Sequence, residues 1–287
     1  MRIYLLAMIV FLAAGPVQAI VLPTFKPFSC EQLVAVGEAR GALFGGVLVA
    51  DPSLLNSSLI IDFLYNHPQL ADLGIREAYD GTAGVSEGFT LREHTRMVLN
   101  VFREQAKFYQ IAAQDYHDAD INRLMQFVLA IHDLGKGLSL QAFEKTLGRP
   151  AESTAELKQA SARQSEFTMP LVKKLVKIFE FNEFESALII ALIEDDVIGG
   201  VVTAKVNVND GFGIMIAKAV KLGITPAAFF NLKLLYFVSD AASYPGLRYG
   251  RGLSSRPRRP VFVEQEGGQL LPISAPFRQL LEKFHRF

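Results

Sequence analysis

The chain contains 287 residues, half of them hydrophobic, and its 29 basic and 29 acidic side chains balance at a pI near 7. This composition is typical of a globular protein with ample core material, and it argues against a nucleic-acid polymer or an anionic membrane as partner. The single cysteine, Cys30, excludes an intramolecular disulfide and a cysteine-based structural zinc site.

The first nineteen residues, MRIYLLAMIVFLAAGPVQA, have the layout of a secretory signal peptide. An early arginine precedes an apolar run from Ile3 to Ala14, and a Gly-Pro break leads to the small-x-small ending at residues 17–19. The apolar run is too short for a comfortable membrane span. We therefore expect an exported protein, periplasmic or secreted, with no stable membrane span after cleavage. An N-terminal anchor that stays uncleaved is the alternative.

Residues 20–87 are predicted to form an N-terminal helical extension. A short helix is expected over 31–40, and a second over 51–65, where an Asp-Pro pair supplies the N-cap and the first helical residue. A polar, glycine-containing loop over 80–89 leads into the next segment.

The middle of the chain is predicted to be helical. Thr90-x-x-Glu93 is a capping box that opens a helix to about residue 110. The next helix is expected over 120–134, with Gly135 in the left-handed conformation ending it, and a polar connection rich in glycine and serine is expected to follow. Further helices are expected near residues 154–165, 168–180 and 183–195.

The last third of the chain continues this pattern. Residues 201–208 are predicted to form a short strand or an extended loop, and a helix follows over 212–222. Thr225-Pro226 opens a very apolar helix through Ala242. A loop over 244–260 and a small hairpin over 261–273 complete the prediction. The expected fold class is therefore an all-α bundle with a small C-terminal β-hairpin.

Two histidines lie on apolar helix faces. His94 falls three residues after Leu91 on the same face of its helix, and His132 falls four residues after Val128. Asp133 stands about 100° further round the last turn, at the predicted end of the helix. Because unpaired carbonyls and the negative end of the helix dipole gather there, this position favours a cation.

A third candidate is Asp240, in the apolar segment AAFFNLKLLYFVSDA. A buried carboxylate costs several kcal/mol in desolvation unless something pairs with it, and the segment offers no obvious local partner. A shared metal ion would account for His94, His132, Asp133 and Asp240 together. Two imidazoles and two carboxylates suit one divalent ion of the kinds Mn, Fe, Co, Ni, Zn or Mg.

These residues resemble the HD-domain metal-dependent phosphohydrolase superfamily. The similarity covers residues 88–245 and consists of a histidine on one helix, a His-Asp dyad followed by Leu-Gly-Lys, and a later aspartate, here His94, His132, Asp133 and Asp240. The resemblance implies an HD-like helical bundle in which the four residues bind one divalent metal. It also implies that a metal-activated water attacks a phosphate ester. Residues 246–287, an arginine-rich loop and a C-terminal segment, are expected to pack on the same domain.

The chain departs from the pattern of many family members, which carry two more histidines between the dyad and the last aspartate. No histidine lies between His132 and His285. In that interval the chain offers Gln164 and Glu166, and the acidic run Glu194-Asp195-Asp196 at the end of an apolar helix, where three negative charges oppose the helix dipole.

The predicted function is hydrolysis of a phosphomonoester or phosphodiester, and the substrate is a small-molecule phosphate ester or nucleotide. Asp133 would act in catalysis as well as in metal binding, Glu194 or Asp195 would orient the water, and Lys136 and Arg248 would bind the phosphate. The first alternative is a non-catalytic ligand-binding or interaction protein that keeps the metal site. The second is metal-dependent oxidation or lyase chemistry on the same scaffold.

Overall fold

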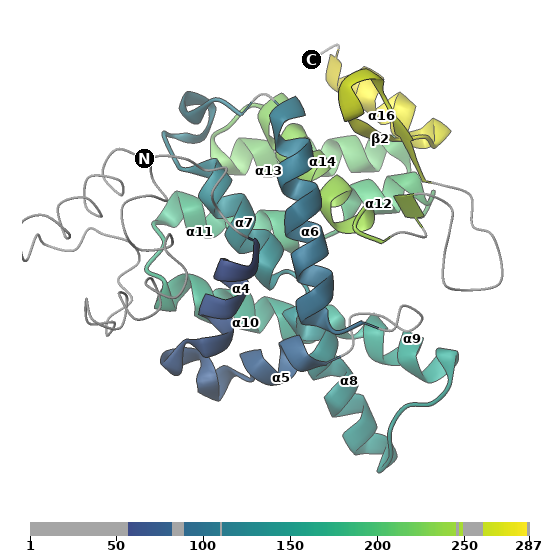
Figure 1. The fold of residues 1–287 in the computed structure, drawn as a ribbon. Coiled ribbons are helices and arrows are strands. Elements are labelled where there is room, and N and C mark those ends of the chain that lie inside the picture. The colour runs from purple at the N-terminus through teal and green to yellow at the C-terminus, as the bar shows by residue number, and fades with distance from the viewer. Residues whose placement is uncertain (1–56, 82–88, 110, 245–246, 249–260, 286–287) are drawn as a thin grey trace, which may run out of the picture.

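The computed structural model describes residues 57–81, 89–109, 111–244, 247–248 and 261–285 (Figure 1). The predicted signal peptide, the helix over 31–40, the start of the helix at Asp51 and most of the two loops over 80–89 and 244–260 lie outside these residues. Within them, the fold class is confirmed: the structure is mainly helical, with one two-stranded antiparallel sheet near the C-terminus.

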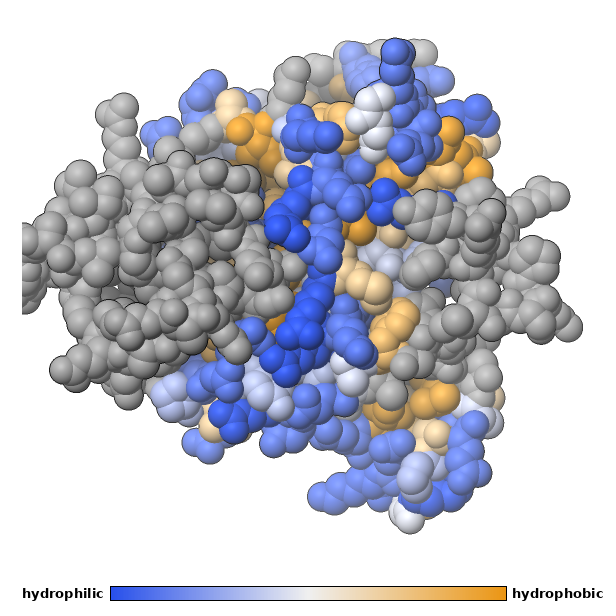
Figure 2. All heavy atoms as spheres, viewed as in Figure 1, coloured by the Kyte–Doolittle hydropathy of each residue, from blue (hydrophilic) through white to orange (hydrophobic). Residues whose placement is uncertain are grey.

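Helix α6 (Leu91–Gln105) crosses the front of the bundle and packs on α7 (Ile121–Ile131) and α14 (Pro226–Ala241) (Figure 1). Its predicted capping box is present, because the Thr90 side chain accepts from the backbone N–H of Glu93 and the Glu93 side chain accepts from that of Thr90. The helix ends at Gln105, earlier than predicted, and a 3₁₀ turn, η3 (Ala106–Phe108), follows. Hydrophilic side chains run along its outer face (Figure 2), while its inner face is buried.

Helices α7 and α14 form the interior of the bundle. Nine of the 11 residues of α7 and 11 of the 16 residues of α14 are buried, as expected for helices that neighbours cover on several sides. Asp120 caps α7 as predicted, and Thr225 with Pro226 begins α14 as predicted. Full burial of a leucine or phenylalanine on these helices stabilises the fold by about 1.5–3 kcal/mol per side chain.

The predicted glycine- and serine-rich connection after Leu134 is wrong. A helix, α8 (Leu134–Leu147), occupies that segment, and Gly135 is helical rather than left-handed. The glycine is needed for packing: a Cβ at this position would lie 2.2 Å from Thr168 Oγ1 and 2.6 Å from the carbonyl oxygen of Gln164. Gly135 therefore lets α8 approach α10 (Gln164–Ile178) closely.

Of the two alternatives predicted for residues 201–208, the strand is wrong, and a loop is present only over residues 203–207. Helix α12 (Val197–Val202) covers the start of this range, a short non-helical segment follows, and α13 (Val208–Leu222) begins four residues earlier than expected. Asn207 explains the early start, because its side chain accepts from the backbone N–H of Asp210 as an N-cap. The valines of α12, Val206 and Val208 pack against the core rather than forming a strand.

The C-terminal hairpin is present. Strand β1 (Phe262–Glu264) pairs with β2 (Leu270–Pro272), with Phe262 opposite Pro272 and Glu264 opposite Leu270. Gly267 and Gly268 both have positive φ, which explains the glycine pair in the turn. Helix α16 (Ala275–His285) then packs on α12, α13 and α14.

The remaining described elements are α4 (Ser57–Asn66), η2 (Pro68–Leu73), α5 (Ile75–Asp80), η4 (Ala113–Tyr116), α9 (Thr154–Ala162), α11 (Glu183–Ile193) and η5 (Glu266–Gly268). Of the described helices, none is by itself both long and apolar enough to cross a membrane. Helices α13 and α14 reach that length and composition only when joined, and they are bent by 112° relative to each other.

Candidate metal centre

Four predicted side chains meet inside the bundle. They come from α6, from the junction between α7 and α8, and from the last turn of α14: His94, His132, Asp133 and Asp240. One ligand atom of each lies within 4.8 Å of all the others. His94, His132 and Asp133 are buried, and the Asp240 side chain is 29% exposed, so the cluster opens to solvent beside Asp240. The structure thus brings together two imidazoles and two carboxylates in an arrangement compatible with an HD-like metal site.

The two imidazoles present the same nitrogen to the carboxylates. His94 Nε2 lies 3.2 Å from Asp240 Oδ1 and 3.3 Å from Asp133 Oδ2. His132 Nε2 lies 3.3 Å from Asp133 Oδ2 and 3.4 Å from Asp240 Oδ1. Four potential ligand atoms therefore surround one small volume, which is the condition for a single ion to contact all of them.

The opposite nitrogen of each ring is held by an outer group. His132 Nδ1 donates to the carbonyl oxygen of Leu129 at 2.8 Å. His94 Nδ1 lies 3.4 Å from Ser243 Oγ, whose own proton goes to the carbonyl oxygen of Asp240. With the proton on Nδ1, the lone pair of each Nε2 points into the cluster. Metal-bound histidines are oriented by the same kind of outer hydrogen bond, so the residues fit a metal ion.

The two carboxylates of the cluster stabilise a positive charge beside them. Burial opposes protonation of His132, but the carboxylates of Asp133 and Asp240 outweigh it and raise the pKa of His132 to about 10. The same carboxylates raise the pKa of His94 against the effect of burial. Conversely, although burial favours the neutral acids, the neighbouring positive charges hold the pKa values of Asp133 and Asp240 below the usual range. Protons and a metal ion would therefore compete for one site.

We expect the metal-free protein to lose stability as the pH rises from 6.5 to 8. In this interval His132 keeps its proton in the folded state but has lost it in the unfolded chain, so the folded state binds more protons. Each such proton lowers the free energy of unfolding by about 1.4 kcal/mol per pH unit. Above pH 8 Lys233 acts in the opposite direction, because burial lowers its pKa to about 8.

Urea unfolding over this interval, with and without saturating divalent metal, measures the effect. A bound metal takes the place of the proton on His132, so the downward slope should disappear in the metal-loaded protein. Equal slopes in the two states would contradict the assignment of His132 as a ligand.

Asp133 is held by two further residues. Gln164 Nε2 donates to Asp133 Oδ1 at 2.9 Å, and the Lys136 ammonium donates to Asp133 Oδ2. Gln164 is the first residue of α10, and the close contact at Gly135 brings this end of α10 against α8. Gly135 therefore serves the site indirectly, because the close approach of the two helices places the amide donor of Gln164 beside Asp133.

Tyr244 is a site residue that the sequence analysis missed. Its ring stacks on His94 with the centroids 4.4 Å apart and the planes 28° from parallel, and Lys136 Nζ lies 3.3 Å from its hydroxyl. Tyr244 follows Asp240 by four residues, so helical periodicity beyond the predicted end of the helix would have indicated it. Phe89 stacks on the same histidine at 6.4 Å.

The other predicted residues lie in different surroundings. The Arg248 side chain pairs with Glu104 at 3.1 Å, and Glu104 is ten residues beyond His94 on α6, about 15 Å along the helix axis. Glu194 pairs with Lys218 at 3.0 Å, and Asp195 pairs with both Lys218 and Lys233. The structure thus places Lys136 at the cluster, whereas the guanidinium of Arg248 and both acids are engaged in ion pairs. Their predicted roles in binding phosphate and orienting water stay predictions.

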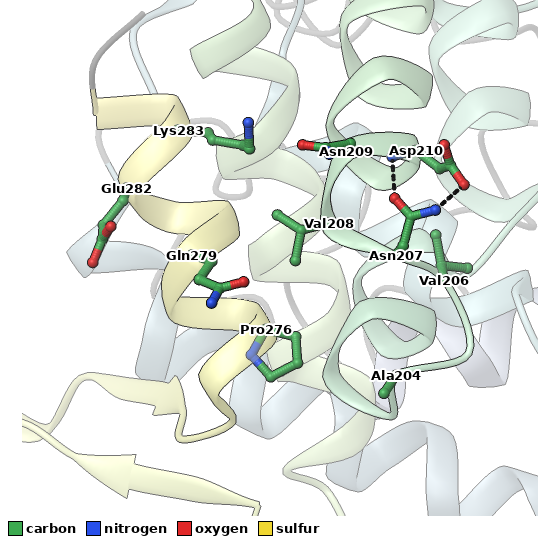
Figure 3. A pocket seen from close by; sticks show the side chains of 10 residues that line it. All are labelled: Ala204, Val206, Asn207, Val208, Asn209, Asp210, Pro276, Gln279, Glu282 and Lys283. Carbon is green, nitrogen blue, oxygen red and sulfur yellow. Dashed lines mark hydrogen bonds between the residues drawn. The ribbon is translucent and has the colours of Figure 1, made fainter.

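A separate surface cavity of about 770 Å³ lies between α16 and the start of α13 (Figure 3). Its lining combines apolar side chains with polar ones, among them Asn207, Asn209, Asp210, Gln279, Glu282 and Lys283. Asn207 and Asp210 bond to each other as part of the α13 cap. None of the predicted site residues lines this cavity.

No known protein family, no curated protein and no solved structure matches this chain. The assignment of a function therefore depends on the chemistry of the cluster itself.

Proposed function

We propose that this protein is a metal-dependent phosphohydrolase of the HD-domain type, with His94, His132, Asp133 and Asp240 holding one divalent ion. The observation that supports the proposal is the convergence of these four ligand atoms within 4.8 Å inside a helical bundle. A divalent ion bound there would lower the pKa of a water molecule and polarise a phosphoryl oxygen. Such an ion suits the cleavage of a small phosphomonoester or phosphodiester, including a nucleotide.

The protein's own groups prepare the site for this reaction. The hydrogen bonds from His132 to Leu129 and from His94 to Ser243 keep both Nε2 atoms directed at the ligand position. Gln164 fixes the carboxylate plane of Asp133. Lys136 adds a positive charge at the open side of the cluster, where it would attract a phosphate and offset the charge that develops during its cleavage.

A second candidate, a non-catalytic binding protein that retains the metal, is favoured by the ion pairs of Glu194 and Asp195. Both acids form ion pairs with lysines, and these lysines would compete with a water molecule for the carboxylate oxygens. In either case we propose that the protein acts outside the cytoplasm, as its N-terminal segment indicates.

Metal content and turnover decide between these candidates. We expect about one divalent ion per chain by plasma mass spectrometry, and metal-dependent release of p-nitrophenol from p-nitrophenyl phosphate or its bis ester. Bound metal without turnover would favour the binding protein, and bound iron would favour oxidation chemistry. A protein that takes up no metal when it is offered would overturn the proposed function.

A further inference from the structure

Tyr244 connects two functional groups of the candidate centre. Its ring covers one face of the His94 imidazole, and its hydroxyl lies within hydrogen-bond distance of the Lys136 ammonium. Tyr244 is partly buried, and it lies on the side where Asp240 and Lys136 remain 29% and 20% exposed. An incoming substrate would therefore meet Tyr244 and Lys136 together.

The hydroxyl of Tyr244 retains a hydrogen to donate. An ammonium group only donates, so in the contact with Lys136 the tyrosine oxygen is the acceptor. Within the part of the chain that the structure describes, no group accepts the hydroxyl proton of Tyr244. A tyrosine hydroxyl carries its proton at neutral pH, so this hydrogen is available to a ligand.

Lys136 also keeps a hydrogen that it can donate to a ligand. Its ammonium has three N–H groups, of which one is directed to Asp133 and one to Tyr244. A third N–H of Lys136 and the O–H of Tyr244 are thus two neighbouring donors beside the metal ligands. Two donors of which one is charged form a suitable site for adjacent oxygens of a phosphoryl group.

We propose that Tyr244 is a substrate-binding residue whose hydroxyl donates a hydrogen bond to a phosphoryl oxygen beside Lys136. The inference rests on the proposed phosphohydrolase function and adds to it the residue that recognises the phosphate. Its stacking on His94 keeps the hydroxyl at a fixed distance from the metal ligands, so that phosphate binding and metal binding occur side by side.

The test compares Tyr244→Phe with the unchanged protein, both as full chains loaded with metal. The phenylalanine keeps the ring on His94 and removes only the hydroxyl. We expect at least tenfold weaker binding of inorganic phosphate by calorimetry, because hydrogen bonds to charged groups are among the stronger ones. The KM for p-nitrophenyl phosphate should rise in parallel, while the metal content and near-ultraviolet circular dichroism stay unchanged.

Tyr65→Phe is the matched control, because the Tyr65 hydroxyl donates to Asp80, away from the cluster. This variant should bind phosphate like the unchanged protein. In the double variant Lys136→Met/Tyr244→Phe, the losses should be less than additive, since both side chains would contact the same group.

The outcomes separate this inference from the proposed function. Unchanged phosphate affinity in Tyr244→Phe would overturn the role of Tyr244 and leave the hydrolase intact. Loss of metal from Tyr244→Phe would show that Tyr244 acts only by supporting His94. This result would also overturn the proposed role of Tyr244 in phosphate binding. If the unchanged, metal-loaded protein binds no phosphate, both the inference and the proposed function fail.

Discussion

Replacing Asp133 by asparagine should abolish metal-dependent hydrolysis and weaken metal binding by more than 100-fold. The substitution keeps the shape of the side chain but removes the negative charge that faces both Nε2 atoms and the Lys136 ammonium. Removal of an outer partner of a ligand already costs 10–100-fold in affinity, so loss of a direct ligand should cost more. Metal titration and p-nitrophenyl phosphate turnover measure the two effects.

Breaking a buried ion pair can also destabilise the fold, since Lys136 would lose its partner. Asp240→Asn therefore serves as a second variant, because Asp240 is more exposed than Asp133 and, within the described residues, forms ion pairs with His94 and His132 but not with Lys136. Asp72→Asn, an exposed carboxylate in η2, is the control and should change nothing. Metal affinity that survives in both Asp133→Asn and Asp240→Asn would refute the metal centre.

Replacing Gly135 by alanine should lower the free energy of unfolding by about 1–3 kcal/mol, the usual cost of overpacking a well-packed core. The added Cβ would lie 2.6 Å from the carbonyl oxygen of Gln164 and from the backbone nitrogen of Thr168, so α8 and α10 have to move apart. This movement would draw Gln164 away from Asp133, and metal affinity should fall along with stability.

Gly213→Ala is the matched control. Gly213 also lies inside a helix, and nothing stands within 4 Å of a Cβ placed there. Its replacement should raise stability by about 0.5–1 kcal/mol through helix propensity alone. Urea unfolding of the two variants gives the comparison, and a Gly135→Ala protein as stable as Gly213→Ala would show that the helix contact is not tight.

Local signals in the sequence predicted much of this fold. The capping box at Thr90, the cap at Asp120 and the Thr225-Pro226 pair each depend on residues within one helical turn, and each begins a helix in the structure. The prediction that Gly135 ends a helix was wrong. A glycine is needed there because the backbone contacts α10, a helix about thirty residues further along the chain. Sequence periodicity contains no information about such a neighbour.

In the candidate site, too, local sequence signals predicted some residues, whereas contacts between distant helices determine others. The four ligand residues were predicted from helix faces and from the cost of burying a carboxylate, and the structure brings them together. The assignment of Gln164 and Ser243 as outer partners depends on side-chain distances between separate helices. Arg248 was predicted to bind the phosphate, but in the structure its guanidinium contacts Glu104 on α6.

The ligands of the centre are 146 residues apart at their extremes, from His94 on α6 to Asp240 on α14. The unfolded chain therefore has no preformed site, and an ion can be captured there only after α6 and α14 have packed together. A metal that binds only the folded state draws the folding equilibrium toward it. An ion bound at this candidate centre would then be selected by the metal supply of the compartment in which folding finishes, because ligands of this kind discriminate poorly among first-row metals.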